Sequence, residues 1–209
     1  MNVLGIVCSP RKGGNTEILI KEALAGANEG GAESELLTMW DKEIKPCDGC
    51  GACHKTGVCH IKDDMLIVSK KMLNADGIIF GTPVYFYTLS AQAKILLDRT
   101  YALRYPKIRL AGKVGGAIAV AGRQGAQGAL DVFHRYFVNQ HIFIVDQIDG
   151  LAGSKGAITK DERAMKSALE VGRQMALLIK LKPKFPEEFD LPLYMVVKKK
   201  YNSRDYPNE

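Results

Sequence analysis

The sequence predicts an α/β fold with a doubly wound, five-stranded parallel sheet in the order 2-1-3-4-5. Short apolar runs alternate along the chain with stretches of helical periodicity, which is typical of βαβ units. The runs are continuous and do not alternate with polar residues, as expected for strands covered on both faces. Right-handed crossovers then leave few possible topologies, and 2-1-3-4-5 is a common order for five such strands.

The elements follow from the pattern in chain order. Five apolar runs are expected to be strands: residues 2–7, 34–39, 77–81, 113–121 and 141–145. Helical spacing predicts helices over 15–30, 127–139 and 160–180. Asp63 or Asp64 is expected to cap a helix before the third strand, and Ser90 to cap the helix after it. The fourth run is rich in Gly and Ala, which permits close packing or close ligand approach.

Composition and charge are those of a globular protein. Of 209 residues, 46% are hydrophobic and 25% are charged. No apolar run approaches the ~20 residues needed to span a bilayer, and the N-terminal run lacks a signal peptide's basic region. The net charge of +6 indicates a solvated basic surface, with no basic–aromatic pattern typical of nucleic-acid binding. We therefore expect a soluble, cytoplasmic protein without nucleic-acid or membrane partners.

The chain divides into a main domain over 1–180 and a C-terminal extension over 181–209. Pro183, Pro186 and Pro192 interrupt helix formation in the extension. Its apolar stretch 191–197 is expected to pack on another surface.

The loop after the first strand suits a phosphate group. Ser9 and Thr16 offer hydroxyls, Asn15 an amide and Arg11 a positive charge, while Gly13 and Gly14 permit a tight turn ahead of a helix N-terminus. The loop contains neither G-x-G-x-x-G nor the P-loop lysine signature. A glycine-rich turn without any ligand is the alternative.

The loop after the third strand is aromatic. It reads Thr82-Pro83-Val84-Tyr85-Phe86-Tyr87. In the predicted order it faces the phosphate loop across the switch point, where the aromatic side chains would offer flat surfaces to a ring. An aromatic patch packed into the core or a dimer interface is the alternative.

Four of the five cysteines lie in one short segment, 44–62. Cys47, Cys50, Cys53 and Cys59 form the pattern C-x2-C-x2-C-x5-C, which favours a 4Fe–4S cluster bound by thiolates alone. Zinc is the main alternative, with His54 and His60 as possible substitutes, and redox thiols are another. Cys8 is expected to be a small buried residue.

Both loops resemble the NAD(P)H-dependent FMN reductase family, whose fold is flavodoxin-like. The family's Ser-x-Arg-x-x-Gly-Asn-Thr motif stands here as Ser9, Arg11, Gly14, Asn15 and Thr16. A second family segment matches Thr82–Tyr85, followed by Lys94, Asp98 and Arg99. With the cysteine-rich insertion after the second strand, roughly residues 1–180 resemble the iron–sulfur flavoproteins, a branch of that family.

The resemblance implies FMN bound by Ser9, Arg11, Gly14, Asn15, Thr16, Thr82, Pro83, Val84, Tyr85 and Phe86. It implies an electron-transfer oxidoreductase that forms a homodimer or homotetramer. A carrier such as ferredoxin would be the donor and oxygen, peroxide or a quinone the acceptor. No acid–base residue is evident. The alternatives are an NAD(P)H-dependent FMN or quinone reductase with structural zinc, and a non-enzymatic redox or metal sensor.

Overall fold

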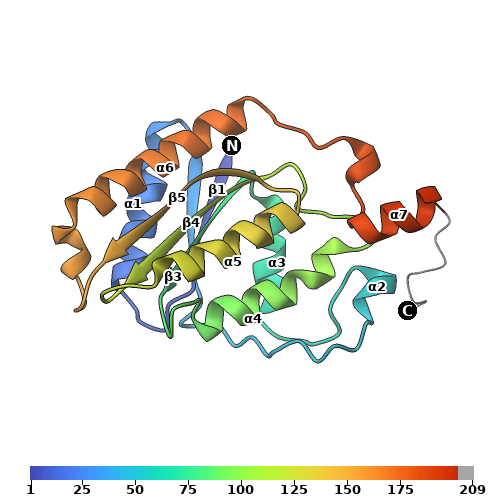
Figure 1. The fold of residues 1–209 in the computed structure, drawn as a ribbon, viewed down its shortest axis with the longest axis horizontal. Helices are drawn as coiled ribbons and strands as arrows, with labels where there is room; N and C mark the ends of the chain where they lie inside the picture. Colours follow the sequence, from blue (N-terminus) through green and yellow to red (C-terminus); the bar gives the residue numbers. More distant parts are fainter. Residues whose placement is uncertain (202–209) are drawn as a thin grey trace.

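The computed structural model describes residues 1–201, and its sheet confirms the predicted topology. Five strands pair in parallel in the order β2-β1-β3-β4-β5. They are β1 (Asn2–Val7), β2 (Glu33–Thr38), β3 (Gly77–Pro83), β4 (Val114–Ala121) and β5 (Phe143–Leu151). In Figure 1 their arrowheads point to one edge of the sheet, the carboxyl edge.

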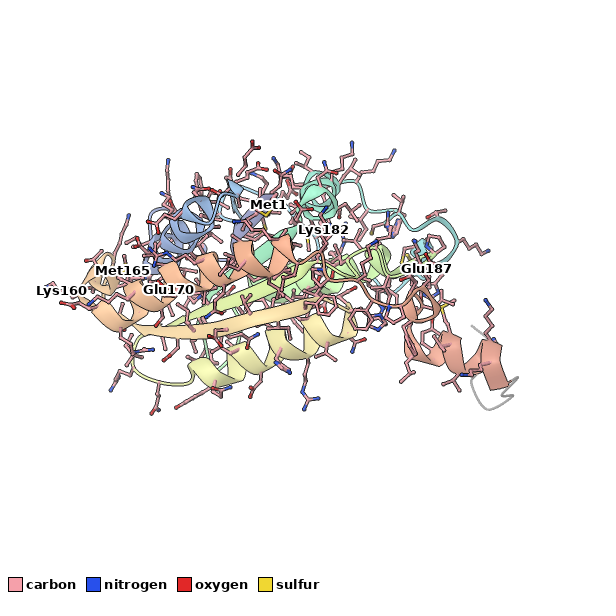
Figure 2. All side chains as sticks on the ribbon, turned by 90° about the horizontal axis from the view of Figure 1, so that it is seen from above. Met1, Lys160, Met165, Glu170, Lys182 and Glu187 are labelled. Atoms are coloured by element: carbon pink, nitrogen blue, oxygen red, sulfur yellow. The ribbon has the colours of Figure 1, made fainter. Side chains whose placement is uncertain are left out.

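Helices cover both faces of the sheet. Long helices α1 (Asn15–Glu29) and α6 (Glu162–Lys180) pack on one face, and α3 (Met65–Asn74), α4 (Ala91–Arg99) and α5 (Ala126–Asn139) pack on the other (Figure 1). Figure 2 shows α6 crossing the sheet from Lys160 toward Lys182, at the amino edge where Met1 lies.

The alternation of side chains along β1 divides the core. Leu4 and Ile6 enter the cluster beneath α3, α4 and α5, whereas Val3 and Val7 enter the cluster beneath α1 and α6. Successive side chains of a strand point to opposite faces, so a strand in mid-sheet supplies both cores. The continuous apolar run in the sequence reflects this double burial.

Two parts of the structure differ from the expected element bounds. β5 runs from Phe143 to Leu151, whereas the expected strand was 141–145; the apolar pattern stops at 145 because the rest of this edge strand carries polar residues such as Asp146 and Asp149. The extension contains a helix α7 (Leu193–Tyr201) that the proline pattern did not suggest. The last residues of the expected C-terminal extension, 202–209, lie outside the part of the chain that the structure describes.

Hydroxyl groups join α7 to the main domain. The Tyr105 hydroxyl lies 3.0 Å from that of Tyr194 in α7 and 3.0 Å from that of Tyr101. Short helices complete the chain: α2 (Cys53–Thr56) and three 3-10 turns, η1 (Thr100–Arg104), η2 (Ala157–Lys160) and η3 (Glu187–Phe189). Among the described residues, no helix is both long and apolar enough to cross a bilayer.

Candidate flavin and metal site

The loop after β1 lies between the strand end and the N-terminus of α1. Ser9 and Thr16 are buried in it, while Arg11 is exposed. The Ser9 hydroxyl accepts a hydrogen bond from the Arg11 backbone N–H at 3.2 Å. First-turn N–H groups of a helix have no intrahelical acceptor, so the end of α1 presents donors to an anion.

A carboxylate already uses one of the loop's donors. The Gly13 N–H donates to Glu17 at 2.7 Å, and the other Glu17 oxygen pairs with Lys21 at 2.7 Å. Burial works to raise the pKa of Glu17, but these partners outweigh it and lower the pKa overall. The sequence reasoning did not single out Glu17, although an acid in the first turn of a helix is a recognisable signal.

Asn15 ties the loop to a second one that the sequence reasoning missed. Its amide donates to the Ser154 carbonyl at 2.8 Å, and its carbonyl accepts from the Ile158 N–H at 3.4 Å. The Nζ of Lys155 lies 3.7 Å from the place that a Cβ on Gly13 would take. Asn15 therefore links the two loops and places a further cation beside the first, and one of its two amide N–H donors is already used in this contact.

The loop after β3 forms a tight aromatic turn. Tyr85 and Thr88 exchange two backbone hydrogen bonds of 3.1 Å, and the two residues between them, Phe86 and Tyr87, have positive φ. Each such residue costs about 1–2 kcal/mol in a chain of L-amino acids. Phe86 is 98% exposed, whereas the Tyr87 hydroxyl accepts a hydrogen bond from Gln124. The turn presents an aromatic side chain at the carboxyl edge.

Ser90 holds the two loops together, and it caps α4 as predicted. Its hydroxyl donates to the Cys8 carbonyl at 2.6 Å and accepts from the Ala93 N–H at 3.2 Å. Its own N–H donates to the Thr82 hydroxyl at 3.1 Å. The β1 and β3 loops thus meet at the carboxyl edge, as the strand order requires.

The cysteine segment starts at that edge but ends far from it. It leaves β2 and runs beside α4, so that the His54 ring stacks on Tyr105 with centroids 4.5 Å apart. The Gly57 carbonyl accepts a hydrogen bond from Arg109. Figure 1 shows α2 at the end of the molecule opposite the strand arrowheads. At 1.5 Å per residue, the distance from Ser90 to Arg99 along α4 is about 14 Å.

The four thiols share one neighbourhood. Cys47 and Cys50 are exposed, and Cys53 and Cys59 are partly buried. Burial raises the pKa of Cys53, and the nearby thiols of Cys59, Cys47 and Cys50 raise it further, against a backbone hydrogen bond. Cys8 is fully buried in the core, as expected, and burial raises its pKa.

The spacing of the donors tests which metal group they fit. Zn–S bonds of about 2.3 Å require sulfurs about 3.8 Å apart in a tetrahedron. Among the described residues, the ligand atoms that gather in threes within 4.8 Å belong to Asp48, Cys50 and His60. Among the described residues, the four thiols are therefore not drawn together around one small ion, and the Asp48–Cys50–His60 group is the competing arrangement for such an ion.

A buried ion pair closes the cysteine segment. Arg99, at the end of α4, binds both oxygens of Asp63 at 2.6 and 3.1 Å, and both side chains are at most 3% exposed. Arg99 also donates to the carbonyl of Lys45 at 2.7 Å, before the cysteines, and to that of Ile61, after them. The sequence had offered Arg99 only as part of a family motif.

Comparison with known proteins agrees with this architecture. Residues 1–155 match the family model described as NADPH-dependent FMN reductase. An iron-sulfur flavoprotein of Methanocaldococcus jannaschii is 40% identical over 191 residues, which cover 87% of this chain and 98% of that protein. Another, from Methanosarcina thermophila, is 44% identical over 61% of this chain and 67% of its own.

A solved structure supports the fold alone. The crystal structure of RosB with a bound formylriboflavin phosphate intermediate superposes with a TM-score of 0.74 at 15% identity, covering 100% of this chain and 90% of that one. The sequence relatives carry the assignment further: this chain belongs to the NADPH-dependent FMN reductase family, in its iron–sulfur flavoprotein branch.

Proposed function

We propose that this flavin-dependent oxidoreductase passes electrons between a 4Fe–4S cluster and FMN. Cys47, Cys50, Cys53 and Cys59 hold the cluster. The observation that carries the proposal is the grouping of these four thiols on a chain whose β1 and β3 loops meet at one edge. FMN can take up two electrons and release them singly, whereas a cluster carries one.

The residues at the carboxyl edge divide into two sets by chemistry. The phosphate is held by Ser9, Arg11, Gly14 and Thr16 at the N-terminus of α1, with Asn15 fixing the loop. The flavin ring is held by the segment from Thr82 to Phe86, whose backbone and aromatic side chains line the edge.

Electron transfer takes place between subunits in this proposal. Within one chain, the rise along α4 from Ser90 to Arg99, whose side chain binds both ends of the cysteine segment, is about 14 Å. A homodimer or homotetramer that brings the exposed Cys47 and Cys50 toward the flavin edge of a neighbour shortens that path.

The donor is a reduced carrier such as ferredoxin, and the acceptor is oxygen, peroxide or a quinone. Cys47 lines a groove of about 520 Å³ between α4 and α5, together with Lys94, Arg104 and Arg135. Asp98 lines the same groove and pairs with Lys94, so Arg104 and Arg135 are the cations that suit an acidic carrier protein docking beside the cluster.

A second candidate is an NAD(P)H-dependent FMN or quinone reductase with structural zinc. The gathering of Asp48, Cys50 and His60 ligand atoms within 4.8 Å favours it. Zinc in that group would leave the other three cysteines without a common role.

Anaerobic purification separates the two candidates. The proposal expects bound FMN together with about four iron and four sulfide per chain, which is the composition of one 4Fe–4S cluster. Zinc without sulfide would overturn it. For the inter-subunit step, oligomers mixed from a Cys47→Ser/Cys50→Ser variant and an Arg11→Ala variant should reduce FMN with ferredoxin faster than either variant alone. No gain from mixing would contradict transfer between subunits.

A further inference from the structure

Arg99 does more than close the cysteine segment. Its two terminal nitrogens are fully used by Asp63 and by the carbonyls of Lys45 and Ile61. Its Nε–H, however, is buried and has no acceptor among the described residues. An unpaired buried donor costs free energy comparable to a lost hydrogen bond, so its retention needs an explanation.

One of the proposed cluster ligands, Cys59, lies close to this guanidinium. Arg99 and Cys59 line the same small cavity, of about 210 Å³, with Ile61. Asp63 is the carboxylate that faces Arg99 from the other side. The guanidinium therefore lies between one carboxylate and one proposed cluster ligand.

We propose that Arg99 is a positioning residue that raises the reduction potential of the cluster through Cys59. This rests on the proposed four-cysteine cluster. Reduction adds one negative charge to the cluster, and a fixed cation with a free N–H beside a ligand sulfur stabilises the more negative state. Asp63 acts with the opposite sign, because its carboxylate partly offsets the cation.

The test is a redox titration of the anaerobic, FMN-loaded oligomer, with the cluster followed by its electron paramagnetic resonance signal. A charge-assisted hydrogen bond predicts roughly a tenfold change in the one-electron equilibrium, which is about 59 mV. Arg99→Gln should lower the potential by about that amount. Asp63→Asn should raise it, and Arg99→Lys, which keeps the charge, should lie closer to the wild type.

The opposite signs separate electrostatics from loosened structure. Arg173→Gln is the charge control, since Arg173 pairs with Glu29 and Glu170 on the α1 and α6 face of the sheet, away from the cysteine segment, and its loss should leave the potential unchanged. A fall in potential for both Asp63→Asn and Arg99→Gln, or an unmoved potential in a fully loaded Arg99→Gln protein, would overturn the inference. If Arg99→Gln does not load, the sign of the Asp63→Asn shift decides it.

A failure of the proposed role of Arg99 can be told apart from a failure of the proposed cluster. If the wild-type protein contains no sulfide, the cluster proposal itself is wrong. If the wild-type protein contains the cluster but neither substitution changes its potential, only the proposed role of Arg99 is wrong.

Discussion

Replacing Gly57 by Ala should release the cysteine segment while sparing the sheet. Gly57 ends α2 at φ +66, and a Cβ there would overlap the backbone carbonyl of Tyr105. The conformation alone costs about 1–2 kcal/mol for alanine. Restoring ordinary contact requires the two backbones to separate by about 1 Å, twice the ~0.5 Å within which a binding site must be held. We therefore expect reduced iron and sulfide content at unchanged FMN content.

Gly31 supplies the matched control for Gly57→Ala. It has φ +85 in the turn before β2, and a Cβ there would meet open space. Gly31→Ala should lower the free energy of unfolding by about 1–2 kcal/mol in urea denaturation and leave iron and sulfide unchanged. The reasoning is refuted if Gly57→Ala loads iron and sulfide like the wild type, or if both variants lose metal equally.

Four further outcomes are expected. Arg11→Ala should weaken FMN binding at least tenfold, as loss of a charge-assisted hydrogen bond predicts, but leave riboflavin binding intact in fluorescence titrations; equal losses would contradict a phosphate contact. Asn15→Ala should speed hydrogen exchange at the Ile158 amide, and unchanged protection would contradict the tie. Burial alone would raise the pKa of Asp63, but its partner Arg99 outweighs burial, so the pKa is lowered overall. Stability from this pair is therefore present above the unfolded pKa, near 4, and lost as pH falls through the lowered folded value. Asp63→Asn should flatten the stability–pH curve there, and an unchanged acid slope would show that the pair is not responsible. Phe86→Gly should raise stability by about 1 kcal/mol through relief of positive φ, yet weaken both FMN and riboflavin binding; unchanged binding would remove Phe86 from the ring site.

Local signals explain what could be predicted from the sequence. β1 and β3 are short apolar runs ended by loops of small and polar residues, and Ser90 precedes a helical pattern. Each of these signals lies within a few residues of the feature it predicts. The strand order followed from connection rules that hold for βαβ units in general.

The features that the sequence did not predict depend on contacts between segments that are distant in the chain. Asp63 and Arg99 are 36 positions apart, and nothing near either residue shows that they pair. The course of the cysteine segment back along α4 depends on ties to Tyr105 and Arg109, which lie some 50 positions downstream. Asn15 was predicted to bind the phosphate, but its observed partners lie beyond β5, where the sequence has only a polar loop.

The hydrogen bonds of Ser90 bear on how flavin enters the folded protein. The two loops proposed to hold FMN are joined through Cys8, Thr82 and Ser90, all of which are buried and bonded to one another by the protein's own groups. A site already assembled loses little chain entropy when its ligand enters. We therefore expect apoprotein prepared by flavin removal to recover FMN without passing through an unfolded state.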